Sequence, residues 1–149
     1  MNDITSLIDR IPRLFHLLKA LGDKLHADLG VTTSMRGVMV SLARDGERTV
    51  PELARERPVS RQHIQTVVDA LTAAGLAMSR PNPQHRRSVL IVLTAEGRRL
   101  FETMQARETE LFRSAHPADP ADIAAAHRVF DALETDLAAH LRPGELIDG

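Results

Sequence analysis

Residues 49–94 read TVPELARERPVSRQHIQTVVDALTAAGLAMSRPNPQHRRSVLIVLT, a segment with closely spaced signals for helix starts and turns. Thr49 and Glu52 have the spacing of a capping box, in which two side chains satisfy backbone N–H groups at the start of a helix. The helix that they begin must be short, because the residue before Pro58 is pushed out of helical geometry. The capping box and the proline together predict a helix of about two turns.

A second helix follows directly after a tight turn, Arg57-Pro-Val-Ser60. The hydroxyl of Ser60 can cap this helix, and Gly75 supplies the left-handed residue that ends it. Its inward face carries four apolar residues at helical spacing: Ile64, Val67, Val68 and Leu71. The β-prone runs 76–80 and 88–94 then flank a polar and basic stretch, which predicts a β-hairpin with a long loop. Two short helices and a hairpin in this order predict a winged helix-turn-helix.

A longer helical pattern precedes this unit. Apolar residues recur at three- and four-residue spacing over residues 7–25, and Pro12 is expected to kink this helix or to mark where its regular part begins. Gly30 is expected to end it. The pair Thr32-Thr33 can cap a further helix that stops near Gly46. The apolar residues of the first helix cover more than a narrow stripe, which favours either oligomerisation or a central place in a bundle.

Two more helices follow the hairpin. Thr94 caps a helix that extends to about Ser114, residues 117–120 break the chain, and a final helix ends at Pro143-Gly144. The chain of 149 residues therefore forms a single domain of the α+β class, mainly α, with long terminal helices around a winged helix-turn-helix. The apolar faces of these helices exceed what a three-helix unit can cover, so we expect an obligate homodimer.

The composition excludes several classes of protein. Cysteine is absent, which excludes disulfides, thiolate metal sites and thiol redox chemistry. Aromatic residues make up only 3% of the chain, which argues against modules that stack bases or sugars. No apolar run approaches the ~20 residues of a membrane span, and the amino terminus lacks the pattern of a signal peptide. We therefore expect a cytoplasmic protein that does not associate with membranes.

The formal net charge of −1 hides a segregation of charge along the chain. Residues 76–100 carry several arginines against the single acid Glu96, whereas residues 101–149 are strongly acidic. The hairpin carries four basic residues with no acid near them in the sequence: Arg80, His85, Arg86 and Arg87. A protruding basic loop of this kind suits phosphates and a narrow minor groove, although each residue separately also fits a solvated turn.

The second helix of the pair has a polar outward face. This face and its cap consist of Ser60, Arg61, Gln62, His63, Gln65 and Thr66. In a major groove, arginine forks onto guanine, glutamine forks onto adenine, and hydroxyl groups reach a base or a phosphate. The face alone would equally fit an exposed polar surface, but together with the basic hairpin it predicts binding to double-stranded DNA.

The chain resembles the multiple-antibiotic-resistance regulator (MarR) family over essentially its whole length. The matching segments are Val59–Gln62, Val68–Leu76, Asn82–Arg87 and Leu93–Gly97. The resemblance implies a homodimer with dimerisation helices at about 5–30 and 95–142 and a DNA-binding lobe at about 32–94. It also implies a sequence-specific transcription regulator, most often a repressor on an inverted-repeat operator, that is released by a small, often phenolic or aromatic anion.

Two residues depart from the family pattern. Asn82 stands where family wings commonly have an aspartate that helps to hold a wing arginine, so this loop is expected to be looser or differently braced. Pro58 stands where a small residue or glycine is usual, and it should stiffen the turn before Ser60. Neither departure removes a predicted DNA contact.

An effector pocket is expected between the first, second and fifth helices. Its candidate lining residues, each of which also has a packing or surface explanation, are His16, Lys19, Met35, Arg36 and Met39. No zinc-binding His-Glu-x-x-His, nucleophile elbow or phosphate-binding glycine loop occurs, so we predict no enzyme, metal site or cofactor. The alternatives are a winged-helix module that binds protein, a DNA-binding metal sensor, and a DNA-binding protein that responds to no ligand.

Overall fold

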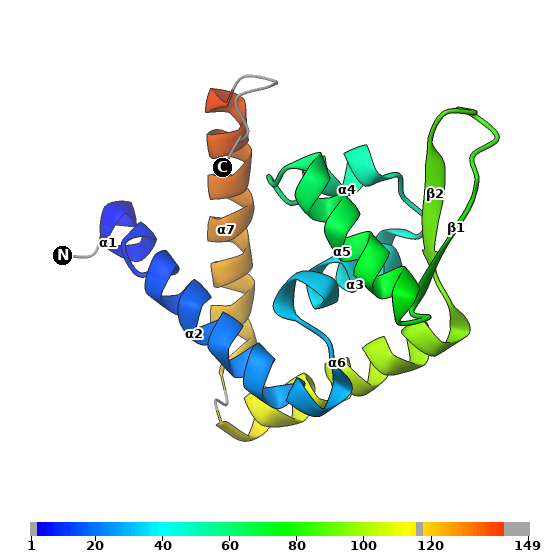
Figure 1. Cartoon of the computed structure of the whole chain (residues 1–149). Helices are drawn as coiled ribbons and strands as arrows, with labels where there is room; N and C mark the ends of the chain where they lie inside the picture. The colour runs from blue at the N-terminus through cyan, green and yellow to red at the C-terminus, as the bar shows by residue number, and fades with distance from the viewer. Residues whose placement is uncertain (1–2, 116–117, 142–149) are drawn as a thin grey trace.

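The computed structural model describes residues 3–115 and 118–141. Its elements are α1 (Ile4–Ile8), α2 (Ile11–Leu25), the 3-10 turn η1 (Ala27–Leu29), α3 (Thr33–Asp45), α4 (Val50–Glu56), α5 (Arg61–Ala73), β1 (Ala77–Pro81), β2 (Val89–Leu93), α6 (Ala95–Ala115) and α7 (Pro120–His140). Helices α3, α4 and α5 and the hairpin gather on one side of the long helix α6, whereas α7 rises from the other end of α6 (Figure 1). This architecture confirms the predicted mainly helical α+β fold with a winged helix-turn-helix.

The predicted helix caps are present. The hydroxyls of Thr32, Ser60 and Thr94 each accept a hydrogen bond from the backbone N–H three residues further on, at 3.2, 3.1 and 3.0 Å respectively. Thr49 and Glu52 form both halves of the capping box at the start of α4. These short-range bonds fix where α3, α4, α5 and α6 begin, and they therefore set the boundaries of the helix-turn-helix.

The hairpin is tied to the rest of the fold at both of its strands. Gly75, with φ of 72°, leaves α5 in the left-handed conformation and directs the chain into β1. Residues 77–81 pair antiparallel with residues 89–93. Arg48, in the connection between α3 and α4, pairs with Ile91 of β2 through backbone hydrogen bonds of 3.2 and 2.7 Å. The hairpin therefore has a fixed base from which its loop extends.

The apolar core lies between α3, α4, α5, the hairpin and α6. Its largest fully buried apolar side chains are Met39, Leu53, Ile64, Leu71, Met104 and Val38. The predicted inward face of α5, which is Ile64, Val67, Val68 and Leu71, is buried. Because one face of α5 is held in this core, the opposite face is presented to solvent.

The N-terminal region differs from the single long helix that the periodicity predicts. Helices α1 and α2 are separate, and Pro12 lies in the first turn of α2, where its missing N–H costs no hydrogen bond. Pro12 therefore marks a helix start and does not kink a continuous helix. Helix α2 also ends at Leu25, and η1 continues to Gly30, whose φ is 65°. The helix stops early because the next side chain, His26, is buried and bonded to α6.

Helices α1, α2 and α7 bury no residue within the chain. Their exposed large apolar side chains are Ile4, Leu7, Ile8, Ile11, Leu14, Phe15, Leu17 and Leu18 on α1 and α2, and Ile123, Val129, Phe130 and Leu137 on α7. The predicted end of the last helix at residues 143–144 lies outside the described residues, and α7 itself ends at His140. Among the described helices, none combines the length and the apolar composition needed to cross a membrane.

Candidate nucleic-acid interface

Helix α5 presents the predicted polar face to solvent. The side chains of Arg61, Gln62, His63, Gln65 and Thr66 are exposed, and Ser60, which caps the helix, is half-buried. Within the described residues, the side chains of Arg61, Gln62 and His63 have no hydrogen-bond or ion-pair partner. Three side chains with hydrogen-bond donors therefore lie on the first turn of α5 without a partner among the described residues.

Two other side chains of this face are engaged within the helix. The Thr66 hydroxyl donates to the backbone carbonyl of Gln62 at 3.0 Å. The Gln65 amide nitrogen donates to the Asp69 carboxylate at 2.8 Å. Sequence reasoning did not single out Asp69, although its position one turn after Gln65 is the spacing at which such a bond forms.

The loop of the hairpin carries exposed cations. His85, Arg86 and Arg87 are exposed and, among the residues that the structure describes, their side chains have no acidic partner. The Asn82 side chain accepts a hydrogen bond of 3.0 Å from the backbone N–H of Gln84, an Asx turn that shapes the loop. Asn82 therefore organises the local backbone and does not hold an arginine, so the loop is braced differently from the family pattern.

The surroundings of Arg80 differ from the prediction for the hairpin. We expected no acid near the basic residues of the hairpin, and for Arg80 this is wrong, because its guanidinium forms a two-point ion pair with Glu47. The sequence separates the two by 33 positions, and the pairing of Arg48 with Ile91 brings them together. The free positive charge of the hairpin thus lies in its loop, and Arg80 ties the first strand to the connection before α4.

Arg57, in the turn before α5, is a further cation that the sequence did not highlight. It is half-buried, its Nε has no hydrogen-bond partner in the described chain, and burial lowers the pKa of its guanidinium. The guanidinium lies against Gly37 of α3, in space that any larger residue at position 37 would occupy. The only sequence signal for this packing was a glycine inside a helix, which often marks a close approach.

The structure places the five residues predicted for an effector pocket in different surroundings. Met35 and Met39 are buried in the core, which gives them a packing role, and Arg36 binds both carboxylate oxygens of Glu108 on α6. His16 is exposed on α2, beside Phe15. Glu108 also lies 2.8 Å from the buried ring of His26, so it joins α2, α3 and α6 at one point.

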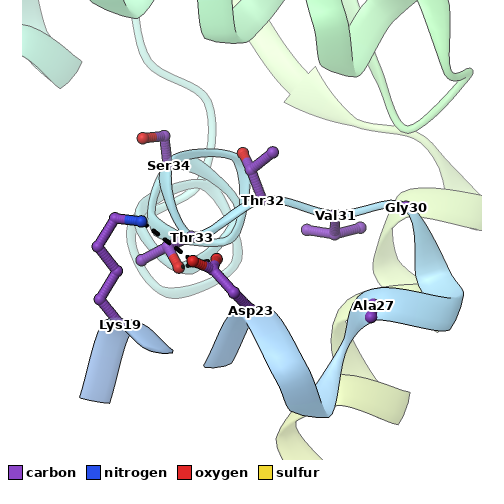
Figure 2. A pocket seen from close by; sticks show the side chains of 8 residues that line it. All are labelled: Lys19, Asp23, Ala27, Gly30, Val31, Thr32, Thr33 and Ser34. Atoms are coloured by element: carbon purple, nitrogen blue, oxygen red, sulfur yellow. Dashed lines mark hydrogen bonds and ion pairs between the residues drawn. The ribbon is translucent and has the colours of Figure 1, made fainter. Parts of the chain in front are cut away.

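Lys19 lines an open pocket of about 460 Å³ at the corner between α2 and α3 (Figure 2). Asp23 accepts hydrogen bonds of 2.6 Å from the Thr33 hydroxyl and 3.0 Å from the Lys19 ammonium group, as the dashed lines in Figure 2 mark. These two bonds, the one from Thr33 first, hold the pKa of the Asp23 carboxyl below its usual range. Thr32 and Ser34 add hydroxyl groups to the rim.

Comparison with known proteins agrees with this geometry. The family model described as the MarR family matches residues 29–88. The uncharacterized protein Rv2011c of Mycobacterium tuberculosis is 35% identical over 138 residues, which are 93% of this chain and 94% of that protein. The crystal structure of the MarR family transcription regulator SP03579 is 25% identical, with a TM-score of 0.77 and coverage of 91% of each chain.

Two further solved structures share the fold. The structure of reduced AbfR bound to DNA has a TM-score of 0.74 at 19% identity, with 93% of this chain and 94% of that chain covered. BpsR of Bordetella bronchiseptica, whose DNA binding is regulated by 6-hydroxynicotinic acid, has a TM-score of 0.71 at 21% identity, with coverage of 89% and 94%. The family-model match over residues 29–88 and the near full-length likeness to the MarR family regulator SP03579 identify the chain as a member of the MarR family of DNA-binding transcription regulators.

Proposed function

We propose that the protein is a homodimeric repressor that reads an inverted-repeat operator with two copies of α5 and is released by a small ligand. The observation that carries the proposal is the exposed face of α5, on which Arg61, Gln62 and His63 have no partner in the described chain, next to a loop of unpaired cations. AbfR, which shares the fold, has been solved bound to DNA. In this proposal residues 32–94 form the DNA-binding lobe, and helices within residues 5–30 and 95–142 form the dimer.

The exposed face of α5 and the loop of the hairpin suit different kinds of contact with DNA. Arg61 and the glutamines of α5 have the reach and the paired donors and acceptors that distinguish bases in a major groove. Arg86 and Arg87 in the loop suit phosphates and a narrow minor groove, where contacts add affinity with little dependence on sequence. We assign base reading to α5 and sequence-tolerant affinity to the loop.

Dimerisation follows from the apolar faces of α1, α2 and α7. Leu14, Phe15 and Leu17 are each at least half exposed, at 50%, 58% and 56%. Several large apolar side chains exposed on neighbouring turns of one helix are typical of an interaction site. A second copy of this chain is the simplest occupant, because a two-fold axis would also place two copies of α5 about one helical turn of DNA apart.

Ligand release is the third part of the proposal. The pocket at Lys19 adjoins the first turn of α3, so a molecule bound there would act on the corner that connects the exposed helices to the helix-turn-helix. An anion would have to compete with Asp23 for the Lys19 ammonium group. BpsR, with the same fold, is regulated by 6-hydroxynicotinic acid, a small aromatic acid.

The experiment that tests the proposal is selection of bound duplexes from a randomised DNA pool by the purified full chain. We expect an inverted repeat with half-sites roughly 10 bp apart. Arg61→Ala and Gln62→Ala should each relax the base preference at symmetric positions, at ~1–3 kcal/mol for each bidentate pair removed. Recovery of no motif with the unaltered protein, or of the parental motif at full contrast with both variants, would overturn the assignment.

A further inference from the structure

Asp69 is an acid in an unexpected place. It is exposed on α5, it is the only acidic residue between Ser60 and Gly75, and it lies one turn after Gln65. A carboxylate on a helix that approaches DNA is repelled by the phosphates and lowers affinity for every sequence. A residue with this electrostatic cost needs a compensating role, and the hydrogen bond that its carboxylate accepts from Gln65 indicates which role that is.

The hydrogen bond fixes the orientation of the Gln65 amide. The amide nitrogen donates to a carboxylate oxygen of Asp69 at 2.8 Å. An ionised carboxylate only accepts hydrogen bonds, so a flipped amide would set its carbonyl oxygen against the carboxylate. The amide nitrogen carries two hydrogens, and Asp69 uses one of them. One N–H group and the carbonyl oxygen remain for other partners.

This remaining pair of groups discriminates between purines. In the major groove, adenine offers an acceptor at N7 and a donor at N6, which match one N–H and one carbonyl oxygen. Guanine offers acceptors at N7 and O6, which require two donors. An amide that is free to turn can give both of its hydrogens to guanine, but an amide held by Asp69 has only one to give.

We propose that Asp69 is a specificity-determining positioning residue, which orients the Gln65 amide so that α5 reads adenine and rejects guanine at that base. The inference rests on the proposed function, because it needs α5 to lie in the major groove. Gln62 provides an internal comparison on the same helix: its side-chain amide has no partner within the described residues and is free to turn. Asp69 therefore governs one base position and leaves the position read by Gln62 unchanged.

The test uses Asp69→Asn and Asp69→Ala in the full chain, after Gln65→Ala has identified the base position that Gln65 reads. Binding is then measured to two duplexes that differ only by adenine or guanine at that position. We expect both Asp69 variants to bind all duplexes several-fold more tightly at low salt, because a negative charge is gone. We also expect the preference for adenine over guanine to fall by about fivefold or more.

If Asp69 acted through its charge alone, its replacement would raise affinity without changing the preference for adenine over guanine. If both duplexes gain affinity equally and their ratio is unchanged, Asp69 acts only as a charge and the inference is wrong. It is also wrong if the Gln65→Ala motif is unaltered, or if the position does not prefer adenine. Failure of the unaltered protein to select any motif would instead refute the proposed function, so the two failures are distinguishable.

Two controls isolate the contact. Glu56→Gln removes an equal charge at the end of α4, from a residue whose partner is Arg48 and not a side chain of α5, so it should leave the adenine-to-guanine ratio unchanged. In the Gln65→Ala background, Asp69→Asn should raise affinity without any further change in the motif. A further loss of base preference in that double variant would contradict the proposed route through Gln65. Thermal unfolding of each variant confirms that the comparison is made between folded proteins.

Discussion

Gly97, in the first turn of α6, lies against the backbone of Leu76, in the connection between α5 and β1. It is buried, and a Cβ atom at this position would overlap the backbone carbonyl of Leu76, which accepts a 3.0 Å hydrogen bond from the N–H of Thr94. Backbone cannot move aside as a flexible side chain can. We therefore expect Gly97→Ala to lower the free energy of unfolding by about 1–3 kcal/mol, as measured by urea denaturation.

Gly22→Ala is the matched control for this prediction. Gly22 also lies in a helix, but the nearest atom to a Cβ there is the hydroxyl of Thr33 at 3.8 Å, an ordinary contact. Alanine is favoured over glycine inside a helix by up to about 1 kcal/mol, so this variant should unfold at a higher urea concentration. Opposite shifts for the two variants are expected, and a stabilising Gly97→Ala would mean that the approach to Leu76 is looser than the structure shows.

At the scale of helices and strands, the sequence predicted what depends on near neighbours. Caps act between residues three apart and a hairpin depends on adjacent runs, so the boundaries of α3 to α6 and of the hairpin could be inferred. The contacts that could not be inferred join distant positions: Glu47 with Arg80, 33 residues apart, and Glu108 with Arg36 and His26, at separations of 72 and 82. The effector pocket stays a prediction for the same reason: Met35 and Met39 are buried in the core, and periodicity alone cannot distinguish a lining methionine from a core methionine.

The capping box of α4 should make stability depend on acid. Glu52 accepts hydrogen bonds of 2.7 and 3.0 Å from the N–H and hydroxyl of Thr49, and the backbone bond is the main reason why the pKa of Glu52 is lowered. A lowered folded-state pKa means that this stabilisation is full above the pKa of the unfolded chain and is lost as the pH falls through the folded value. Glu52→Ala removes the carboxylate that accepts both bonds, so it should cost about 1 kcal/mol at pH 7, and the difference from the unaltered protein should shrink below about pH 4 as Glu52 of the unaltered protein takes up a proton. Chemical denaturation across this range measures it, and a constant difference would contradict the linkage.

The hairpin loop should supply affinity that salt weakens. Arg86 and Arg87 are exposed and, within the described chain, unpaired, whereas Arg80 is already neutralised by Glu47. Replacing both loop arginines with alanine should weaken binding to every sequence and reduce the slope of log affinity against log salt, by about 0.9 for each phosphate that the loop no longer neutralises. Arg80→Ala is the comparison, and it should change the slope less. An unchanged slope in the double variant would reduce the loop to a solvated turn.

At the scale of the whole molecule, the chain divides into a part with a closed core and a part without one. The helix-turn-helix, the hairpin and α6 bury the apolar core, whereas α1, α2 and α7 contribute no buried residue to it. In Figure 1, α7 and the α1–α2 arm stand apart from the helix-turn-helix. Long amphipathic helices are stabilised mainly by packing of their apolar face, so these helices need a partner surface to be stable at their observed length.

The apolar faces of α1, α2 and α7 are the surface to which a second copy of the chain is expected to bind. An obligate dimer formed through these helices would bury upwards of ~2,000 Å², and a charged side chain at its centre would be left without solvent or a counter-ion. We therefore expect Leu14→Glu and Phe130→Glu to convert the protein from dimer to monomer or to unfold it, as measured by sedimentation together with circular dichroism. Each monomer would hold one half-site, so affinity for the full inverted repeat should fall by a factor of ~100 or more.

Met78→Glu separates this effect from the general cost of adding a charge. Met78 is 49% exposed, against 50% for Leu14, but it lies on the hairpin and outside the proposed interface. This variant should sediment as a dimer at micromolar concentration, because the added charge stays in solvent. A dimer that survives both Leu14→Glu and Phe130→Glu would place the interface elsewhere. An unaltered protein that sediments as a folded monomer at the same concentration would show that α2 and α7 are stable without a second copy, and the argument from their exposed faces would then fail.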